Sequence, residues 1–332
     1  MSYVDEINKR LEVSQDNDYP LYPEDMSRVV LRLETTNICN HKCAFCPNSK
    51  LERVKKNIDP DFAYRMIGEA AEMGVRRGAF FLMGEPLICP EVLDYYKYAK
   101  FEKNYNFLFF TTNGSLASEK KVEEILNSGI DSLKFSINAG TPETYCKIHG
   151  ADDYEKAIAA LKYAYEYRNR HNIKCRILSS YIVTNTNVDE AVDHYENIRD
   201  YVDDFAFFGM SSFAGAVAEE TESLKSEFNP ENMEYTDFPY ECPCQFLNNS
   251  ININVEGYLT ACVVEHMNFT AIEDLSEMSL KEAWYSDRMV AFRQRHKEKN
   301  IKGLVCYNCV NGTAEPVVPI NTALYERAKR GK

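Results

Sequence analysis

The sequence has no apolar run that approaches the roughly 20 residues a helix needs to cross a bilayer. Its first residues, Met1 to Pro20, are polar and acidic, and they lack the apolar stretch of a secretory signal peptide. These two absences predict a cytoplasmic protein that has no membrane partner.

Positive charge is also scarce. The chain carries 38 lysines and arginines against 51 aspartates and glutamates, which gives a net charge of −13. Proteins that bind nucleic acid through its phosphates need a basic face, so we expect no nucleic-acid partner. We interpret the basic end of the chain, residues 327–332, as a solvated tail.

The 332 residues, 45% of them apolar, allow one large domain or one large and one small domain. Strand-like and helix-like segments alternate from about residue 29 to residue 210. The expected strands are 29–34, 78–83, 107–111, 132–137, 174–183 and 205–209, and the expected helices between them are 61–72, 90–103, 118–129, 154–169 and 188–201. Six such repeats predict an α/β fold of parallel βαβ units, a partial (β/α)6 TIM-like barrel, although a doubly wound sheet fits the same pattern.

The alternation stops after about residue 212. Apolar and polar residues alternate from 250 to 263 around Glu256-Gly257, which predicts a hairpin, and residues 280–297 predict one amphipathic helix. We therefore expect four parts: an N-terminal extension (1–28), the partial barrel (29–212), a linker or lid (213–241) and a small α+β cluster-binding domain (242–332).

Cysteine is plentiful, with eleven in the chain, and metal or redox chemistry is its usual role in a reducing compartment. Cys39, Cys43 and Cys46 follow the first expected strand with C-x3-C-x2-C spacing. Three thiolates on one tight loop can hold three corners of a 4Fe–4S cube and leave one iron open to another ligand. A zinc site completed by His41 is the alternative.

This spacing, with Phe45 before the third cysteine, resembles the signature of the radical S-adenosylmethionine (SAM) superfamily over roughly residues 29–210. The resemblance implies that SAM chelates the open iron and is cleaved to a 5′-deoxyadenosyl radical, which takes a hydrogen atom from the substrate. It also makes Gly84-Glu85-Pro86 the counterpart of the motif that binds the SAM amino group, with Met83 in place of the first glycine. Gly84 would let the backbone approach the ligand, and Glu85 would accept from the ammonium.

The same resemblance implies further SAM contacts at the ends of later strands. Asn113 stands in a Thr-Asn-Gly triplet after the third strand. Ser136 and Asn138 end the fourth strand, where the family contacts the ribose, and Ser179 on the fifth strand is a candidate for the carboxylate.

A second set of cysteines resembles the start of a SPASM domain. Twelve residues separate Cys244 from Gly257, which is followed by Cys262, and Cys306-x2-Cys309 comes later with no cysteine after it. This is the pattern of the truncated, twitch form, which implies one auxiliary 4Fe–4S cluster on Cys244, Cys262, Cys306 and Cys309 that serves electron transfer. A zinc ribbon on the same thiolates and Cys242 in place of Cys244 are the alternatives.

The cysteine spacing is close to that of the radical SAM dehydrogenase of butirosin biosynthesis, which oxidises an aminocyclitol. The resemblance favours a dehydrogenase acting on a small polar molecule such as a sugar, nucleotide sugar or aminocyclitol, with a ferredoxin or flavodoxin as reductant. Three alternatives stay open: an epimerase that uses the Cys242 thiol as hydrogen donor, a peptide-modifying maturase, and an electron carrier or zinc-bearing binding protein without enzymatic activity.

Overall fold

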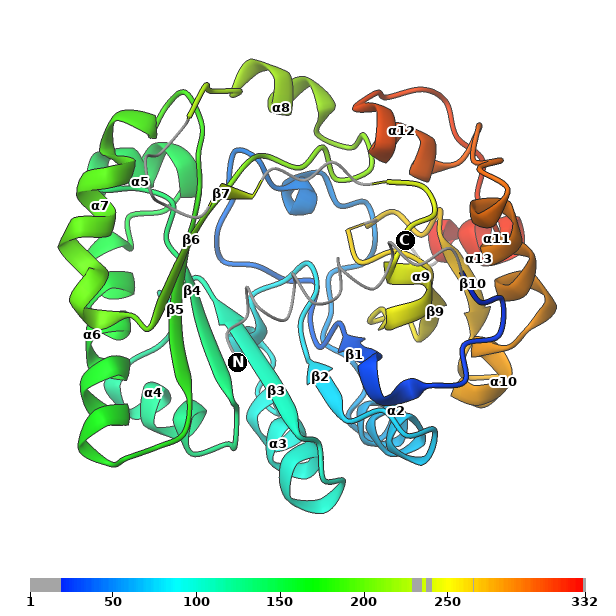
Figure 1. Cartoon of the computed structure of the whole chain (residues 1–332), viewed down its shortest axis with the longest axis horizontal. Helices are drawn as coiled ribbons and strands as arrows, with labels where there is room; N and C mark the ends of the chain where they lie inside the picture. The colour runs from blue at the N-terminus through cyan, green and yellow to red at the C-terminus, as the bar shows by residue number, and fades with distance from the viewer. Residues whose placement is uncertain (1–18, 229–234, 237–240, 265, 331–332) are drawn as a thin grey trace.

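The computed structural model describes residues 19–228, 235–236, 241–264 and 266–330. Its centre is a curved sheet whose first six strands run parallel and lie side by side in chain order (Figure 1). They are β1 (Val30–Leu33), β2 (Arg77–Ala79), β3 (Phe107–Thr112), β4 (Ser132–Ser136), β5 (Arg176–Ile182) and β6 (Asp204–Phe208). A doubly wound sheet reverses its strand order, and this sheet does not, so the architecture is the partial barrel that the sequence predicts.

Helices cover the outer face of these strands in Figure 1. They are α2 (Pro60–Glu72), α3 (Val92–Lys97), α4 (Glu119–Leu126), α5 (Pro142–His149), α6 (Tyr154–Arg170) and α7 (Ala191–Ile198). Polar side chains fix where helices begin: Asp59 accepts from the Phe62 amide at the start of α2, and Ser118 accepts from the Lys121 amide at the start of α4.

Several expected elements are shorter in the structure. The strand expected at 78–83 ends at Ala79, the helix expected at 90–103 is α3 followed by a π-helical turn (Tyr98–Glu102), and the one expected at 188–201 is α7 between two 3-10 turns. Three further 3-10 turns, Met26–Arg28, Pro47–Lys50 and Pro86–Ile88, lie before β1 and in the loops that follow β1 and β2.

The C-terminal part of the chain continues the same sheet. The predicted hairpin is confirmed as β8 (Ser250–Ile253) and β9 (Tyr258–Thr260), and β10 (Ala271–Asp274) pairs with β9. β8 lies parallel to β1, with Val30 opposite Ser250, and β7 (Tyr235–Thr236) lies parallel to β6. The sheet order is therefore β10-β9-β8-β1-β2-β3-β4-β5-β6-β7.

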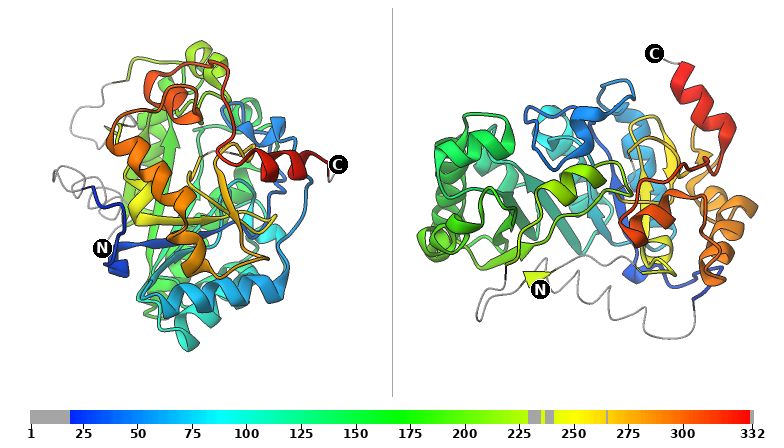
Figure 2. Two further views of the ribbon diagram at one scale, coloured as in Figure 1. Left: turned by 90° about the vertical axis from the view of Figure 1, so that its right-hand side faces the viewer. Right: turned by 90° about the horizontal axis from the view of Figure 1, so that it is seen from above.

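The remaining helices are α8 (Ala218–Ser223), α9 (Phe246–Asn249), α10 (Leu280–Trp284), α11 (Asp287–Lys297), α12 (Val305–Asn311) and α13 (Thr322–Arg330). Figures 1 and 2 show α10 to α13 gathered at the end of the molecule opposite α6 and α7. The single helix expected at 280–297 is wrong: Ser286 caps a new helix by accepting from the Met289 amide, so the chain turns between α10 and α11.

The interpretation of the basic end as a solvated tail is also wrong for the described residues. Arg327 on α13 forms ion pairs with Asp274 and Glu277, and its guanidinium lies 5.5 Å from the centre of the Tyr258 ring. These contacts attach α13 to β9 and β10.

A buried ion cluster joins the barrel to the hairpin. One nitrogen of Arg53 lies 2.7 and 2.6 Å from the two carboxylate oxygens of Glu34, and another lies 3.1 Å from Glu256. Glu34 also accepts from the Val255 amide at 3.0 Å. Among the described helices, none has the length and apolarity needed to cross a membrane.

Candidate active site

A cavity of about 340 Å³ lies at the carboxyl ends of the barrel strands. Nine of the predicted site residues line it: Cys39, Cys43, Cys46, Gly84, Glu85, Pro86, Asn113, Ser136 and Asn138. Parallel strands bring their carboxyl ends to one edge of a sheet, and this is why residues from four different loops meet here.

The three cysteines of the first cluster lie on the loop between β1 and α2. Two backbone hydrogen bonds pin this loop to the end of α5: Lys42 donates to the His149 carbonyl at 2.9 Å, and Ala44 donates to the Ile148 carbonyl at 2.8 Å. Burial, with smaller contributions from Glu85 and Cys46, raises the pKa of the Cys39 thiol to about 11. Thiols that repel one another as anions in a buried site fit a metal cluster, which supplies the missing positive charge.

Two histidines lie beside Cys43. The ligand atoms of His41, Cys43 and His149 lie within 4.8 Å of one another, so a zinc ion is a geometrically possible occupant. Both imidazoles already have partners, however. The Nε2 of His41 lies 3.3 Å from Asp153, and the Nε2 of His149 accepts from the Asn138 amide at 3.1 Å. Burial, with a smaller contribution from His41, lowers the pKa of His149 to about 3.

Glu85 is buried at the end of the β2 loop. Its carboxylate accepts from the Thr112 hydroxyl at 2.7 Å, from the Asn113 amide at 2.8 Å and from the Leu87 amide at 3.3 Å. Burial raises the pKa of Glu85 to about 7 against the lowering effect of these three donors. The carboxyl group therefore faces the cavity in a fixed position. Because its pKa is about 7, it changes between its charged and neutral forms near neutral pH.

Gly84 has a role that differs from the expected one. A Cβ atom at this position would lie 2.4 Å from the Thr36 carbonyl oxygen and 2.7 Å from that of Ile38. The adjacent Glu85 amide donates to the same Ile38 carbonyl at 2.9 Å. The close approach is thus between the β2 loop and the cysteine loop of this chain, and no ligand is needed to explain the glycine.

The structure corrects the prediction for Ser179. Its side chain points away from the cavity and donates to the Phe135 carbonyl at 3.4 Å, whereas Ser180 lines the cavity. Successive residues of a strand point to opposite faces of the sheet, so Ser179 and Ser180 cannot both face the cavity. Ser180 replaces Ser179 as the candidate.

Asn113 and Asn138 use their side chains to connect loops. The Asn113 amide nitrogen donates to Asn40 at 2.9 Å, and the Asn138 side-chain oxygen accepts from the Ile182 backbone at 2.7 Å. Both residues therefore hold the rim of the cavity in shape as well as facing it.

A second, smaller space holds the C-terminal cysteines. Cys244, Cys262, Cys306 and Cys309 all line it. Burial, together with the other C-terminal cysteines, raises the pKa of Cys306 well above its usual value. The Ala214 backbone donates a hydrogen bond to Cys309, which lowers the pKa of that thiol against the larger effect of burial. Four converging thiols of this kind fit a metal centre.

Cys242 lies outside both spaces. It does not line the barrel cavity or the space shared by the four cysteines, and its thiol lies 3.4 Å from the His296 carbonyl oxygen as a donor. The structure thus favours Cys244 over Cys242 as a ligand. The thiol proposed as a hydrogen donor does not line the barrel cavity, and that role of Cys242 stays a prediction.

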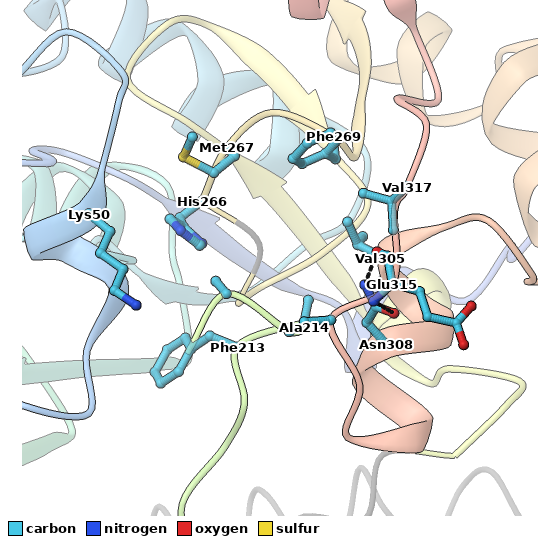
Figure 3. Close-up of a pocket in the computed structure, with 13 residues that line it drawn as sticks. Lys50, Phe213, Ala214, His266, Met267, Phe269, Val305, Asn308, Glu315 and Val317 are labelled. Atoms are coloured by element: carbon cyan, nitrogen blue, oxygen red, sulfur yellow. Dashed lines mark hydrogen bonds between the residues drawn. The ribbon is translucent and has the colours of Figure 1, made fainter. Parts of the chain in front are cut away.

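The loop after β6 contributes residues that sequence reasoning missed. Phe213, Ala214 and Gly215 have φ angles of 48°, 58° and 90°, a left-handed run that is rare for residues other than glycine. Phe213 lines both the barrel cavity and a rim cavity of about 280 Å³ (Figure 3), and Ala214 lines the rim cavity and the cysteine space. Only Gly215 could have indicated this turn in the sequence.

Other cavity residues were missed because the sequence does not show which residues of a strand, or of the loop behind it, face inward. Lys134, Ser180, Ser211 and Val264 line the barrel cavity, and Val264 also lines the cysteine space. His149 also lies here: it is 1% exposed, and its Nδ1 atom lies 3.4 Å from the Cys43 sulfur.

Comparison with known families agrees with this geometry. Residues 33–208 match the radical SAM superfamily, and residues 242–310 match SPASM, an iron–sulfur cluster-binding domain. The chain belongs to the radical SAM superfamily. It is a radical SAM enzyme with a SPASM domain that uses SAM and a 4Fe–4S cluster.

Curated relatives match over part of the chain. A probable GTP 3',8-cyclase of Thermococcus kodakarensis is 28% identical over 138 residues, which are 41% of this chain and 44% of the relative. One from Methanosarcina mazei is 31% identical over 161 residues, 46% of this chain and 47% of the relative. The chain thus spans about half the length of the curated relatives it matches first.

Solved structures match over most of the chain. BtrN in complex with AdoMet and 2-DOIA is 18% identical with a TM-score of 0.54, covering 86% of this chain and 95% of that one. Streptococcus suis SuiB bound to S-adenosylmethionine is 16% identical with a TM-score of 0.62, covering 90% and 75%. These likenesses support the fold: a mostly parallel sheet of partial TIM-barrel type with a C-terminal cluster-binding region.

Proposed function

We propose that this radical SAM enzyme is an oxidoreductase, a dehydrogenase that oxidises a small polar molecule with the help of an auxiliary 4Fe–4S cluster. The observation that carries the proposal is the set of four cysteines, Cys244, Cys262, Cys306 and Cys309, converging on one space whose wall residue Val264 also lines the barrel cavity. Four protein ligands leave no open iron, which suits a centre that accepts an electron and does not bind substrate. We propose the twitch form, in which these four cysteines hold one auxiliary cluster.

The cavity supports a small polar substrate. Beside the cysteine loop and the Gly84-Glu85-Pro86 segment, it is lined by hydrogen-bonding groups of β4, β5 and the loop after β6, namely Lys134, Ser136, Ser180 and Ser211. A sugar, a nucleotide sugar or an aminocyclitol presents several hydroxyl or amino groups that such a lining can orient.

The chain's own residues divide the work. Cys39, Cys43 and Cys46 hold the first cluster, and Glu85 accepts from the amino group of SAM while Thr112 and the Asn113 amide fix its carboxylate. The bound cluster and SAM supply hydrogen-atom abstraction from the substrate. Asn113, Ser136, Asn138 and Ser180 orient SAM and substrate at the strand ends, and Phe213 separates the barrel cavity from the rim cavity.

The protein partners of this reaction are proposed on chemical grounds. A cluster that must be reduced by one electron at a time suits a ferredoxin or flavodoxin as donor. With a net charge of −13, no nucleic-acid partner is proposed. The parts 29–212 and 242–332 carry the two cysteine sets, and residues 213–241 connect them.

The test begins with metal analysis of anaerobically prepared full-length protein in which Cys39, Cys43 and Cys46 are all alanine. We expect about four irons and four sulfides per chain to remain, since a 4Fe–4S cluster is held by the C-terminal thiols. Zinc or no metal in that variant would contradict the auxiliary-cluster proposal.

A matched pair separates the two adjacent cysteines. In the same background Cys244→Ala should lose the remaining iron, whereas Cys242→Ala, two residues away, should keep it. In the wild-type enzyme a substrate oxidised by two electrons, with one SAM consumed per product, supports a dehydrogenase. Solvent hydrogen incorporated into an otherwise unchanged product would show an epimerase instead.

A further inference from the structure

The Cys43 thiol has one side-chain neighbour that none of the family motifs accounts for. The Nδ1 atom of His149 lies 3.4 Å from the Cys43 sulfur. The imidazole is enclosed: it stacks on Tyr145 with ring centres 4.1 Å apart, and the rings of His41 and Phe45 meet it edge-on at 5.5 and 6.5 Å.

The backbone fixes the distance between the two residues. The cysteine loop donates two hydrogen bonds to the last residues of α5, from Lys42 to the His149 carbonyl and from Ala44 to that of Ile148. Gly150 then ends the helix at a φ of +64°, and a Cβ there would lie 3.0 Å from the Lys42 carbonyl oxygen. His149 therefore sits against Cys43 because the loop and the helix are joined on both sides of it.

The hydrogen bonds of the ring decide where its proton lies. The backbone amide of Asn138 can only donate, and it meets the Nε2 of His149 at 3.1 Å, so Nε2 is the acceptor. An imidazole that accepts at Nε2 carries its hydrogen on Nδ1. That N–H points at the Cys43 sulfur. Asn138 is itself held by the Ile182 amide, which donates to its side-chain oxygen at 2.7 Å.

We propose that His149 is a positioning residue that donates an N–H···S hydrogen bond to Cys43 and thereby raises the reduction potential of the SAM-binding cluster. The proposal rests on the proposed ligation by Cys39, Cys43 and Cys46. Reduction adds negative charge to the cluster and its sulfur ligands, and a fixed donor stabilises that charge more than it stabilises the oxidised state. The residue takes no part in bond making or breaking.

The test compares two substitutions in the full-length protein after anaerobic cluster reconstitution. His149→Phe keeps an aromatic ring against Tyr145 and removes the N–H. We expect the cluster to assemble with unchanged iron content and its reduction constant to fall about tenfold, which is about 59 mV for a one-electron couple. In His149→Asn the amide nitrogen occupies the place of Nδ1, and we expect most of the wild-type potential to return.

Tyr145→Phe is the matched control. It keeps the ring stacked on His149, and within the described residues the Tyr145 hydroxyl has no hydrogen-bond partner to lose. Its potential should equal that of the wild type. The potential is followed by electron paramagnetic resonance (EPR) in a dye-mediated titration, on the signal that changes when SAM is added, which separates this cluster from an auxiliary one.

The outcomes are distinct. A wild-type potential in His149→Phe would overturn the inference and leave the proposed function standing. A wild-type protein with no SAM-responsive cluster would overturn the proposed function first. If His149→Phe assembles no cluster, the decision passes to wild-type protein with 15N-labelled histidine: a nitrogen coupling to the reduced cluster in electron–nuclear double resonance supports the hydrogen bond, and its absence refutes it.

Discussion

At the scale of single residues, the most informative group is the Glu85 carboxyl. It is buried beside three donors, and its pKa is raised to about 7, with burial as the cause. Below that pH the group is protonated and neutral, and above it the carboxylate is charged. An ammonium group bound nearby prefers the charged form.

This titration predicts how SAM binding depends on pH. Affinity should rise with pH up to about 7 and then level off, with a slope of at most about tenfold per pH unit below pH 7. Glu85→Gln should bind SAM more weakly and with a flat profile between pH 5.5 and 8. Equilibrium dialysis with labelled SAM measures both curves. A wild-type profile that stays flat over this range would contradict a contact between Glu85 and the amino group.

The adjacent serines on β5 give a second prediction at this scale. Ser180→Ala removes a hydroxyl from the cavity and should weaken SAM or substrate binding by about 1 kcal/mol, or roughly fivefold. Ser179→Ala is the matched control, and it should leave binding within twofold because its hydroxyl faces the Phe135 carbonyl. Dissociation constants for both variants decide the question. Equal losses of affinity would contradict the structure, in which only Ser180 faces the cavity.

The pair also shows what sequence could give. The sequence position of the fifth strand predicted that its polar end would reach the site, but it did not predict which of its residues face the cavity. Which of two consecutive serines faces inward depends on how β5 pairs with β4 and β6, and that register is set by residues far away in the chain.

At the scale of elements, the contact between the β2 loop and the cysteine loop holds the first cysteine set in place. Gly84 lies where any side chain would meet the backbone of Thr36 and Ile38. Backbone atoms cannot rotate away as the end of a side chain can, so a methyl group here must separate the two loops.

Gly84→Ala should therefore lower the free energy of unfolding by about 1–3 kcal/mol, the usual cost of overpacking, and should reduce iron incorporation at the first cluster. Gly68→Ala in α2 is the control, because the nearest atom to its Cβ is 3.7 Å away and alanine favours helix by roughly 0.5–1 kcal/mol. Thermal unfolding and iron analysis report both effects. If the Gly84→Ala protein is as stable as the wild type and binds as much iron, the close contact between the β2 loop and the cysteine loop is contradicted.

Elements with strong local signals were predicted well, and those shaped by packing were not. Asp59-Pro60 and Ser118 mark helix starts that the structure confirms. The break between α10 and α11 was missed, although Ser286 is a recognised cap, because the apolar anchors Trp284 and Phe292 fit one continuous helical stripe. The left-handed run at Phe213 has no local cause for its first two residues.

At the scale of the whole molecule, the Glu34–Arg53–Glu256 cluster connects the end of β1, the loop that carries the first cysteine set and the turn of the β8–β9 hairpin. Removing one member leaves buried charge without compensation. We expect Arg53→Met to lower the free energy of unfolding by about 3–5 kcal/mol.

The exposed pair of Lys97 and Asp94 is the control for that variant, and Lys97→Met should change stability by less than about 1 kcal/mol. Denaturant unfolding monitored by the far-ultraviolet signal compares the two. Equal effects in the two variants would show that the buried cluster contributes little to the junction.

The two cysteine sets, one in the barrel part and one in the C-terminal part, were readable from motifs because each has its own spacing. The way these parts join was not readable. The pairing of β8 with β1 needs two short apolar strands about 220 residues apart to find each other, and nothing in either segment specifies its partner. The positions of Val264 and Phe213 could not be predicted either. Each of them lines two cavities, and this arrangement exists only in the assembled fold.

That pairing has a consequence for how the chain is made. The outer edge of β1 is completed only when Ser250 to Ile253 have left the ribosome. At a synthesis rate of about 5–20 residues per second, this edge waits roughly 10–40 s for its neighbour. During that time the nascent chain exposes a row of unpaired peptide groups that another chain can join. Yield in a host cell should then depend on how well chaperones shield this early strand until Ser250 to Ile253 are translated.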